Sequence, residues 1–395
     1  MRRRRPQKHF FGTIPLAWFQ LTSNKVRFIV AVLGVAFAGM SVFMQLAFQD
    51  SLYDSQTSVH QLLKADLIVF NAEMQSLHRP FSFPRQHLYR LLNYSGVSSV
   101  NTLHAAQRAF RNADLPTGVA ITFFGVNPAQ VPFEFASPPP SFSELNLTGV
   151  AWLSDKSDLK SFGATGDALL NGETVRAELG GKKIHVRRLA DFAGASFVDE
   201  GNILLGLPTF LQVVSEQSAE EVTLGLITLE PGANLAAVKQ TLRSQLPEKL
   251  HLMTQQEFID YEKDYWAKAA PIGFILKMGV FVSFSVGVII VYQILYNEVS
   301  DHLPDYAVLK ARGFKHRYFL NILFQEALLL ALTGYIPGVL LSLLLYEITR
   351  NATALPMTMT PERATFVFVV SLAICFTSGA ISMAKLREAD PADLF

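Results

Sequence analysis

Four long apolar runs divide the chain, and polar segments separate each run from the next. They cover residues 28–48, 271–296, 319–346 and 364–384. About 20 helical residues cross the hydrocarbon core of a membrane, and lipid leaves no water to satisfy a broken backbone. We therefore predict four transmembrane helices over these ranges. The first run is longer than the apolar part of a signal peptide and lacks a small-residue cleavage motif, so we expect it to remain as an anchor.

Residues 49–270, between the first two runs, contain no apolar stretch of spanning length and predict an α+β domain. Short β-like runs alternate there with helical patterns, and Pro138-Pro139-Pro140 marks a boundary. We predict that residues 55–128 and 221–265 pair in one porter-like subdomain, into which residues 129–220 are inserted. The predicted strands are 65–70, 118–125, 174–179, 183–189, 221–229 and 249–253, the predicted helices are 84–94 and 234–246, and a hairpin turn is predicted at Gly180-Gly181.

Residues 254–270 have the pattern of a polar helix and lead directly into the second apolar run. Pro271 stands at the junction, where it kinks the helix or begins the span afresh. We expect residues 254–270 to act as a rigid strut that transmits motion between the membrane helices and the α+β domain. Before the first span, residues 14–24 allow two interpretations, an amphipathic helix at the cytoplasmic surface or an irregular anchor.

The composition and the basic residues predict location and orientation. Half of the residues are hydrophobic, 17% are charged and the mean hydropathy is +0.26, whereas soluble chains carry about 25% charged residues. Lys and Arg gather on the cytoplasmic side of membrane proteins. Seven lie in residues 1–27, four in the loop 297–318, and two each in the tail 385–395 and the loop 347–363. We expect a multi-pass membrane protein with both termini and the loop 297–318 in the cytoplasm, and with the large domain and the loop 347–363 on the other side of the membrane.

The chain carries no sequence signature of an enzyme or a metal site. It lacks the motifs G-x-x-x-x-G-K-[ST], H-E-x-x-H, G-x-S-x-G and C-x-x-C, and its nine histidines are scattered. One cysteine, Cys375, cannot form an intrachain disulfide. The net charge of +1 gives no reason to expect a nucleic-acid partner. We expect a non-catalytic protein that binds no metal and no cofactor of its own.

Two polar residues, Gln325 and Glu326, lie inside the third apolar run. A charge at the bilayer centre costs about 2.5–3.5 kcal/mol, so an acid within a span usually faces the interior of a helix bundle. Two roles stay open for Glu326: bracing a neighbouring helix or the cytoplasmic loop, and contact with a substrate or a proton. In the same run, Gly334, Pro337 and Gly338 lower the regularity of the helix and allow a neighbour to pack closely.

The loop between the second and third spans has the pattern of a short helix, with Pro304 in its first turn and Gly313 just past its end. It resembles the coupling segment of permeases of the MacB and FtsX group, in which an acid, a small residue, two apolar residues, Lys-Ala, any residue and Gly follow in that order. The corresponding residues are Asp305, Ala307, Val308, Leu309, Lys310, Ala311 and Gly313. The family often has Glu where this chain has Asp305.

Three further motifs are similar to the DevC permeases of cyanobacteria, the membrane subunits of DevBCA-type exporters. They are Gly313-Phe314-Lys315, Phe324-Gln325-Glu326-Ala327 and Gly334-Tyr335-Ile336-Pro337-Gly338. The order of one span, a large external domain, three spans and a Pro-Ala-Asp-Leu tail also resembles these permeases. The resemblance implies a MacB/FtsX-like permease of the type VII ABC class, integral to a bacterial (cyanobacterial) inner membrane through four α-helices. Its extracytoplasmic α+β domain, between the first and second helices, and the loop 347–363 would lie in the periplasm.

The resemblance also implies partners and a mechanism. A separate DevA-like ABC ATPase would bind the coupling segment and hold Mg-ATP, and two permease copies would form a homodimer among membrane lipid. Closure of the ATPases would move the external domain by mechanotransmission, and glycolipid would leave through a DevB-like membrane fusion protein and a TolC-like outer-membrane duct. The residues implied in ATPase coupling are Leu303, Asp305, Ala307, Leu309, Lys310, Ala311, Gly313, Phe314 and Lys315.

Other functions fit a similar layout. An FtsX-like permease would regulate a cell-wall hydrolase, but its external domain is usually smaller than the segment 49–270. A lipoprotein-releasing permease differs from the exporter only in its cargo. A membrane-anchored sensor would need a cytoplasmic output domain, which the short tails do not offer.

Overall fold

The computed structural model describes residues 14–388, apart from residues 114, 138, 140, 270, 303–307, 309–311, 313–315, 354 and 356. The chain divides into two compact units. The helical unit comprises Met1–Asp50, Ile272–Ala352 and Met357–Phe395, and the α+β unit comprises Ser51–Pro271 with Thr353–Pro356. Each unit has hydrophobic cores of its own.

Four helices in the described part of the chain are long and apolar enough to cross a membrane. They are α2 (Lys25–Leu62), α8 (Ile272–Asp301), α10 (His316–Thr353) and α11 (Pro361–Glu388). Each covers one predicted apolar run to within a residue and continues past it, because apolar length marks only the part of a helix that lipid can cover. A short helix, α1 (Ile14–Ser23), precedes α2, so these residues are helical rather than irregular.

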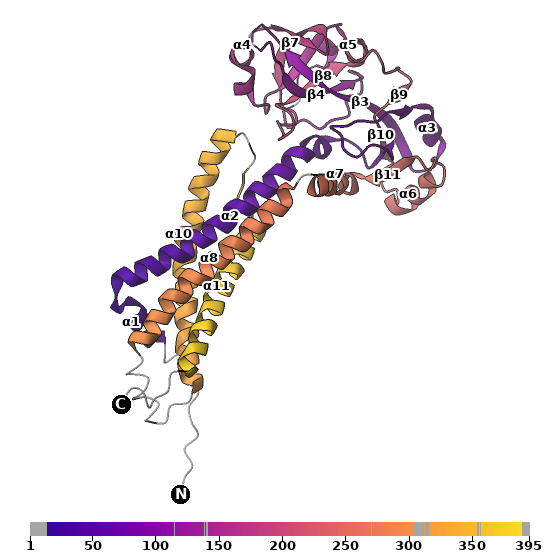
Figure 1. The fold of residues 1–395 in the computed structure, drawn as a ribbon. Coiled ribbons are helices and arrows are strands. Elements are labelled where there is room, and N and C mark those ends of the chain that lie inside the picture. Colours follow the sequence, from indigo (N-terminus) through magenta and orange to yellow (C-terminus); the bar gives the residue numbers. More distant parts are fainter. Residues whose placement is uncertain are drawn as a thin grey trace. The chain divides into compact units, whose positions relative to one another are not determined.

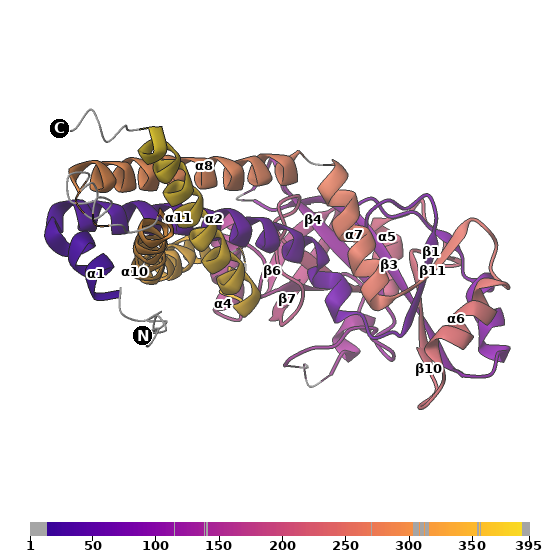
Figure 2. The same ribbon diagram turned by 90° about the horizontal axis from the view of Figure 1, so that it is seen from below.

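Small residues let the long helices of the helical unit approach closely. A Cβ atom on Gly334 of α10 would lie 2.5 Å from the Cβ atom of Val35 of α2. A Cβ atom on Gly338 would lie 3.1 Å from the carbonyl oxygen of Ala36. Elsewhere in this unit α8 and α11 run side by side (Figures 1 and 2). The glycines of the third apolar run thus serve the close packing that the sequence predicted, and Pro337 lies between them inside α10.

One nine-stranded sheet forms the frame of the α+β unit, in the order β11-β1-β10-β3-β4-β8-β5-β7-β6. Its strands are β1 (Leu67–Asn71), β3 (Val97–Arg111), β4 (Val119–Val126), β5 (Val150–Ser154), β6 (Val175–Leu179), β7 (Lys182–Ala190), β8 (Asn202–Gly206), β10 (Leu224–Leu229) and β11 (Leu250–Thr254). Because β6 also pairs with β3, the strands β3, β4, β8, β5, β7 and β6 close into a ring. A separate two-stranded sheet pairs β2 (Phe83–Pro84) with β9 (Glu221–Val222).

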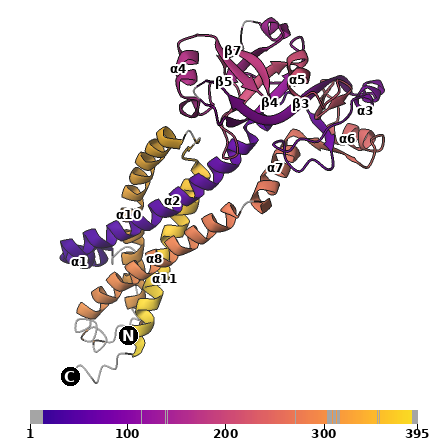
Figure 3. The same cartoon turned by 45° about the horizontal axis from the view of Figure 1, so that its top comes forward.

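Short helices flank this sheet within the α+β unit. Those near β10 and β11 are α3 and α6, and those at the ring of strands are α4 and α5 (Figures 1 and 3). The helices and 3-10 turns are α3 (Gln86–Tyr89), η1 (Arg90–Asn93), η2 (Ser143–Asn146), η3 (Leu159–Phe162), α4 (Ala164–Leu170), α5 (Leu207–Val213), α6 (Leu235–Arg243) and α7 (Gln255–Ala269). The predicted polar helix before Pro271 is α7.

The predicted strands have counterparts within two residues of their predicted ends, except that the strand predicted at 221–229 is divided into β9 and β10. The strands β2, β3, β5 and β8 were not predicted. β5 and β8 are short and wholly buried, and such apolar runs give no period that separates a strand from a buried helix. β3 is long, with His, Gln and Arg among its apolar positions. Its pattern therefore does not alternate cleanly.

The sheet also crosses the boundary that the sequence placed at residue 128. β4, on one side of that boundary, pairs in parallel with β8 on the other. β3 pairs with β10 through its first residues and with β4 through its last. Residues 129–220 therefore complete a sheet that begins in residues 97–126, because strand pairing depends on contacts that no local pattern records.

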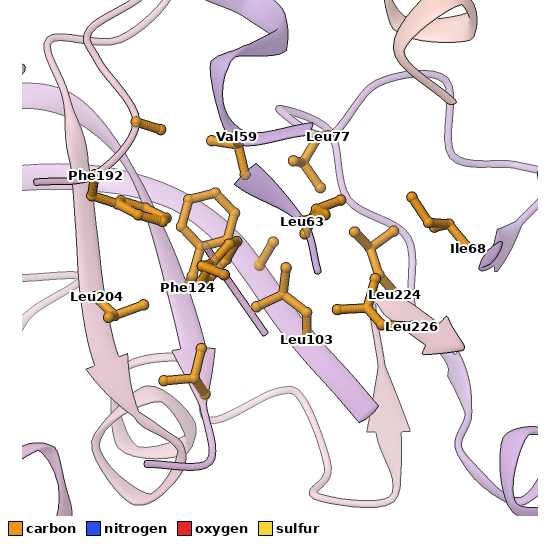
Figure 4. Close-up of a cluster of buried hydrophobic side chains, with 14 of the residues drawn as sticks. Val59, Leu63, Ile68, Leu77, Leu103, Phe124, Phe192, Leu204, Leu224 and Leu226 are labelled. Atoms are coloured by element: carbon orange, nitrogen blue, oxygen red, sulfur yellow. The ribbon is translucent and has the colours of Figure 1, made fainter. Parts of the chain in front are cut away.

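A hydrophobic core binds these parts together (Figure 4). Val59, near the end of α2, and Leu63, just after it, lie beside Leu103 of β3 and Phe124 of β4. Phe192, from the segment after β7, completes this contact, with its ring 5.8 Å from that of Phe124. Aromatic rings bury large apolar areas and dominate core energetics. The end of α2 is thus part of the core of the α+β unit.

Candidate functional site

The predicted ATPase-coupling residues lie outside the described residues. They are Leu303, Asp305, Ala307, Leu309, Lys310, Ala311, Gly313, Phe314 and Lys315. Their role therefore stays a prediction, and the structure bears only on the helix ends beside them.

An ion-pair cluster ties the start of α2 to the end of α8, next to the predicted coupling segment. Arg27 Nη1 lies 2.5 Å from Asp301 Oδ2 and 3.7 Å from Glu298 Oε2. His302 Nε2 lies 3.3 Å from Glu298 Oε1. Because Glu298 is largely buried, its contacts are screened less by water than those of an exposed pair. A displacement of the end of α8 would therefore act on α2 as well.

Glu326 is completely buried within the helical unit, whereas the neighbouring Gln325 is half-buried. Near it on α10, Leu323, Ala327 and Leu330 are buried in a hydrophobic core of the helical unit. Within the described residues, neither carboxylate oxygen of Glu326 has a hydrogen-bond partner. The bracing role proposed from the sequence therefore finds no partner in this part of the chain.

A second charged contact holds α2, α10 and α11 together elsewhere in the helical unit. Arg363 Nη2 lies 2.6 Å from Asp50 Oδ2, and its guanidinium carbon lies 5.9 Å from the ring centre of Tyr346. The hydroxyl of Tyr346 donates to the carbonyl oxygen of Phe43 at 2.9 Å. The sequence placed Arg363 only as a charge that sets orientation. Its side chain is in fact almost fully buried and joins three helices.

The most elaborate polar site lies in the α+β unit and centres on Glu262 of α7. This carboxylate is completely buried, on the same face of α7 as Phe258. It accepts hydrogen bonds from Ser76 Oγ at 2.6 Å and from the backbone N–H of Leu77 at 3.0 Å. Trp266 Nε1 donates to it at 2.8 Å. A buried carboxylate is tolerated only with such partners.

Two histidines contact the acids of this site. His60 Nε2, at the end of α2, lies 3.2 Å from Glu262 Oε2. His78 bridges two acids, with Nε2 3.2 Å from Asp199 Oδ2 and Nδ1 3.8 Å from Glu262 Oε1. Asp199 also accepts a hydrogen bond from Thr122 Oγ1 at 2.5 Å. We call these five residues, with Ser76 and Trp266, the Glu262 network.

The two acids and the buried setting perturb the ionisation of His78 and Glu262. Burial by itself lowers the pKa of His78, but its contacts with the charged Asp199 and Glu262 outweigh burial and raise the pKa to about 9. Burial by itself raises the pKa of Glu262, but its contacts with His60, His78 and Ser76 outweigh burial and hold that pKa well below its usual range. His78 is therefore a cation between two carboxylates at neutral pH.

The Glu262 network joins segments that are distant in sequence. Trp266 of α7 makes an edge contact with Phe197, in the segment before β8, at a centroid distance of 4.8 Å. That segment also carries Asp199, which reaches Thr122 on β4. α7 is thus connected to the end of α2, to the segment after β1 and to the ring of strands. It is held by all three.

Sequence reasoning missed every member of this network as a site. Their separations along the chain, 202 residues between His60 and Glu262 for example, leave no motif. One signal was present: Glu262 stands four residues after Phe258 and four before Trp266, so it falls on the apolar face of a polar helix. An acid on the apolar face of a helix indicates that a buried polar group pairs with it.

The hydrogen bonds of the network hold α7 in place. Among the described residues, no group of three or more His, Cys, Asp or Glu side chains is arranged to hold a metal ion. The donors to Glu262 fill its acceptor positions from several directions. The arrangement can position α7, and it can resist its displacement.

The bridge that His78 forms between Asp199 and Glu262 should make the stability of the α+β unit depend on pH. The ordinary pKa of His is 6.5, and that of His78 is about 9, so the contribution of this group is fully present below pH 6.5 and is lost as pH rises through about 9. We expect the urea midpoint, measured by pulse proteolysis of the full chain, to fall between pH 7 and pH 10. His78→Gln should flatten this dependence and His87→Gln should not. Equal profiles in the three proteins would contradict the bridge.

Comparison with known proteins identifies a family for the C-terminal part. Residues 277–391 match the FtsX-like permease C-terminal family. No curated protein shows a significant sequence match. The periplasmic region of MacB from Actinobacillus actinomycetemcomitans is 12% identical, over 50% of this chain and 92% of that one, with a TM-score of 0.34. The extracellular domain of the noncanonic ABC-type transporter YknZ from Gram-positive bacteria is 15% identical, over 48% and 99%, with a TM-score of 0.32.

Proposed function

We propose that this chain, which carries an FtsX-like permease domain over residues 277–391, is the membrane subunit of an ABC transporter. A separate ATPase binds the segment 303–315 and supplies the energy. The chain itself hydrolyses nothing. The observation that carries this proposal is the family match, which spans the predicted coupling segment and three of the four candidate spans.

The α+β unit responds to the ATPase by mechanotransmission rather than by passing substrate through its spans. The long helices carry few polar groups, which suits a lever better than an aqueous pore. α7 ends at Ala269, and α8 begins at Ile272, directly after Pro271. A pull on α8 therefore reaches α7 through a very short connection. The Glu262 network then carries it to the end of α2 and to the ring of strands, because separating buried charges costs several kcal/mol.

The finer proposal follows the resemblance to DevC permeases. Two copies of the chain form a homodimer with two DevA-like ATPases that hold Mg-ATP. The α+β unit meets a DevB-like membrane fusion protein on the periplasmic side, and a TolC-like duct continues the path across the outer membrane. The cargo class is glycolipid. Both termini lie in the cytoplasm of a bacterium, of cyanobacterial type.

Charge reversal in the coupling segment tests the proposal directly. We expect Asp305→Lys and Lys310→Glu to abolish co-purification of a P-loop ATPase with the tagged chain from its native membranes, because docking needs those charges. Lys249→Glu, an exposed lysine of the α+β unit, is the matched control and should retain the ATPase. Mass spectrometry of the eluate identifies the partners, and an ATPase assay checks their activity.

Each outcome of that purification decides something. An ATPase together with a membrane fusion protein supports the exporter. An ATPase with a cell-wall hydrolase would instead assign an FtsX-like regulatory role. Retention of the ATPase by both reversed variants would remove the coupling segment from the mechanism, and absence of any ATPase from the wild-type eluate would overturn the proposal.

A further inference from the structure

A row of basic side chains covers the outward face of the hairpin β6–β7. Along β7, the exposed positions Lys183, His185 and Arg187 are all basic, while Ile184 and Val186 between them are buried in the ring of strands. Successive strand residues point to opposite faces. The basic residues therefore share the solvent-facing side of the ring.

Neighbouring strands extend this row. Arg111 at the end of β3 is paired with Glu178 of β6, and Glu178 with Lys183 of β7. In the next row, Arg176 of β6 stands directly opposite His185 of β7. All five side chains line one cavity of about 500 Å³. Small-molecule sites have volumes of about 300–1,000 Å³.

The cavity has more positive charge than its one acid can balance. Arg111, Arg176 and Lys183 contribute three positive charges and Glu178 one negative charge, which leaves two positive charges before His185 is counted. Glu178 lies 3.9 Å from Arg111. Within the described residues, Arg176 and Lys183 have no ion-pair partner. The net positive charge of this lining therefore favours an anion.

We propose that this cavity, lined by Arg111, Arg176, Lys183 and His185, binds a phosphoryl group carried by a small molecule or by a lipid headgroup. The guanidinium groups offer forked donors that match phosphate oxygens, and Lys183 adds a point charge. A phosphate monoester carries close to two negative charges at neutral pH, which equals the excess in the cavity. Among the described residues that line the cavity there is no Phe, Tyr or Trp, the rings on which the bases of a single-stranded nucleic acid mainly stack. The proposal is independent of the ATPase coupling.

Isothermal titration calorimetry of the purified full chain with pyrophosphate tests the site. Binding should weaken as salt rises, and the double variant Arg176→Gln, Lys183→Gln should bind at least about tenfold more weakly, since charge-assisted hydrogen bonds are the strong ones. Lys182→Gln, on the same strand but outside the cavity lining, is the matched control and should bind as the wild type does. Arg176→Lys keeps the positive charge but lacks the forked N–H donors of the guanidinium group. Its affinity for pyrophosphate should therefore lie between those of the double variant and the wild type. If the double variant fails to fold, Arg176→Gln and Lys183→Gln give the same comparison singly.

Competition experiments distinguish the source of the phosphoryl group. If a water-soluble short-chain phosphatidic acid displaces pyrophosphate at a lower concentration than inorganic phosphate does, while the matching phosphatidylcholine does not, the ligand is a lipid headgroup. If inorganic phosphate displaces it as readily as phosphatidic acid, a soluble phosphorylated molecule fits. The proposal is overturned if pyrophosphate does not bind, if Lys182→Gln loses as much affinity as the double variant, or if poly-glutamate binds more tightly, which would indicate an acidic protein surface instead.

Discussion

Glu262→Ala should lower the free energy of unfolding of the α+β unit by about 3–5 kcal/mol, because removing one member of a buried charge network strands the others. The substitution leaves His78 beside Asp199 alone and takes the acceptor away from Ser76, the Leu77 amide and Trp266. It also opens a cavity at a completely buried position.

Hydrogen exchange of the β1 amides in the purified full chain measures this loss, since opening of the unit controls their exchange. Asp264→Ala, an exposed acid two residues away on α7, is the matched control and should change little. Glu262→Gln keeps one acceptor oxygen and removes the charge, so its effect should lie between the two. If the β1 amides exchanged at the same rate in Glu262→Ala and in Asp264→Ala, the Glu262 network would not be holding α7.

A Gly-Ser-Gly-Ser insertion after Lys268 should uncouple the α+β unit from ATP hydrolysis. The insertion lies beyond Trp266, so the Glu262 network stays intact, but a flexible segment absorbs displacement that a helix would transmit. In the permease–ATPase complex, exchange of the Leu77 amide, which donates to Glu262, should respond to nucleotide in the wild type. In the insertion variant that response should disappear while ATP hydrolysis continues.

The same insertion after Gly172, in an exposed turn of the α+β unit, is the control and should keep the nucleotide response. A response that survives insertion after Lys268 would show that motion reaches the unit by another route. Loss of ATP hydrolysis in the variant would point to impaired docking rather than to a strut. This test needs no knowledge of the cargo.

The sequence was enough to predict the elements that depend on the residues of a single segment. Four apolar runs became four long helices, because length and hydropathy are properties of a single segment. The hairpin at Gly180-Gly181 is confirmed, since both glycines adopt positive φ, of 55° and 79°, which other residues adopt only at a cost. The polar helix before Pro271 is also present as α7. The coupling segment and the orientation stay predictions.

Tertiary structure decided what depends on distant segments. Parallel pairing of β4 with β8, the closure of β6 onto β3 and the filling of one core from both sides of residue 128 leave no trace in local periodicity. The Glu262 network is of the same kind. Apart from Glu262, its acid and its two histidines look like ordinary surface residues when each is taken with its neighbours in sequence. Only folding brings them within hydrogen-bonding distance in a buried place, where charge is costly unless it is paired, and that pairing is what makes them a site.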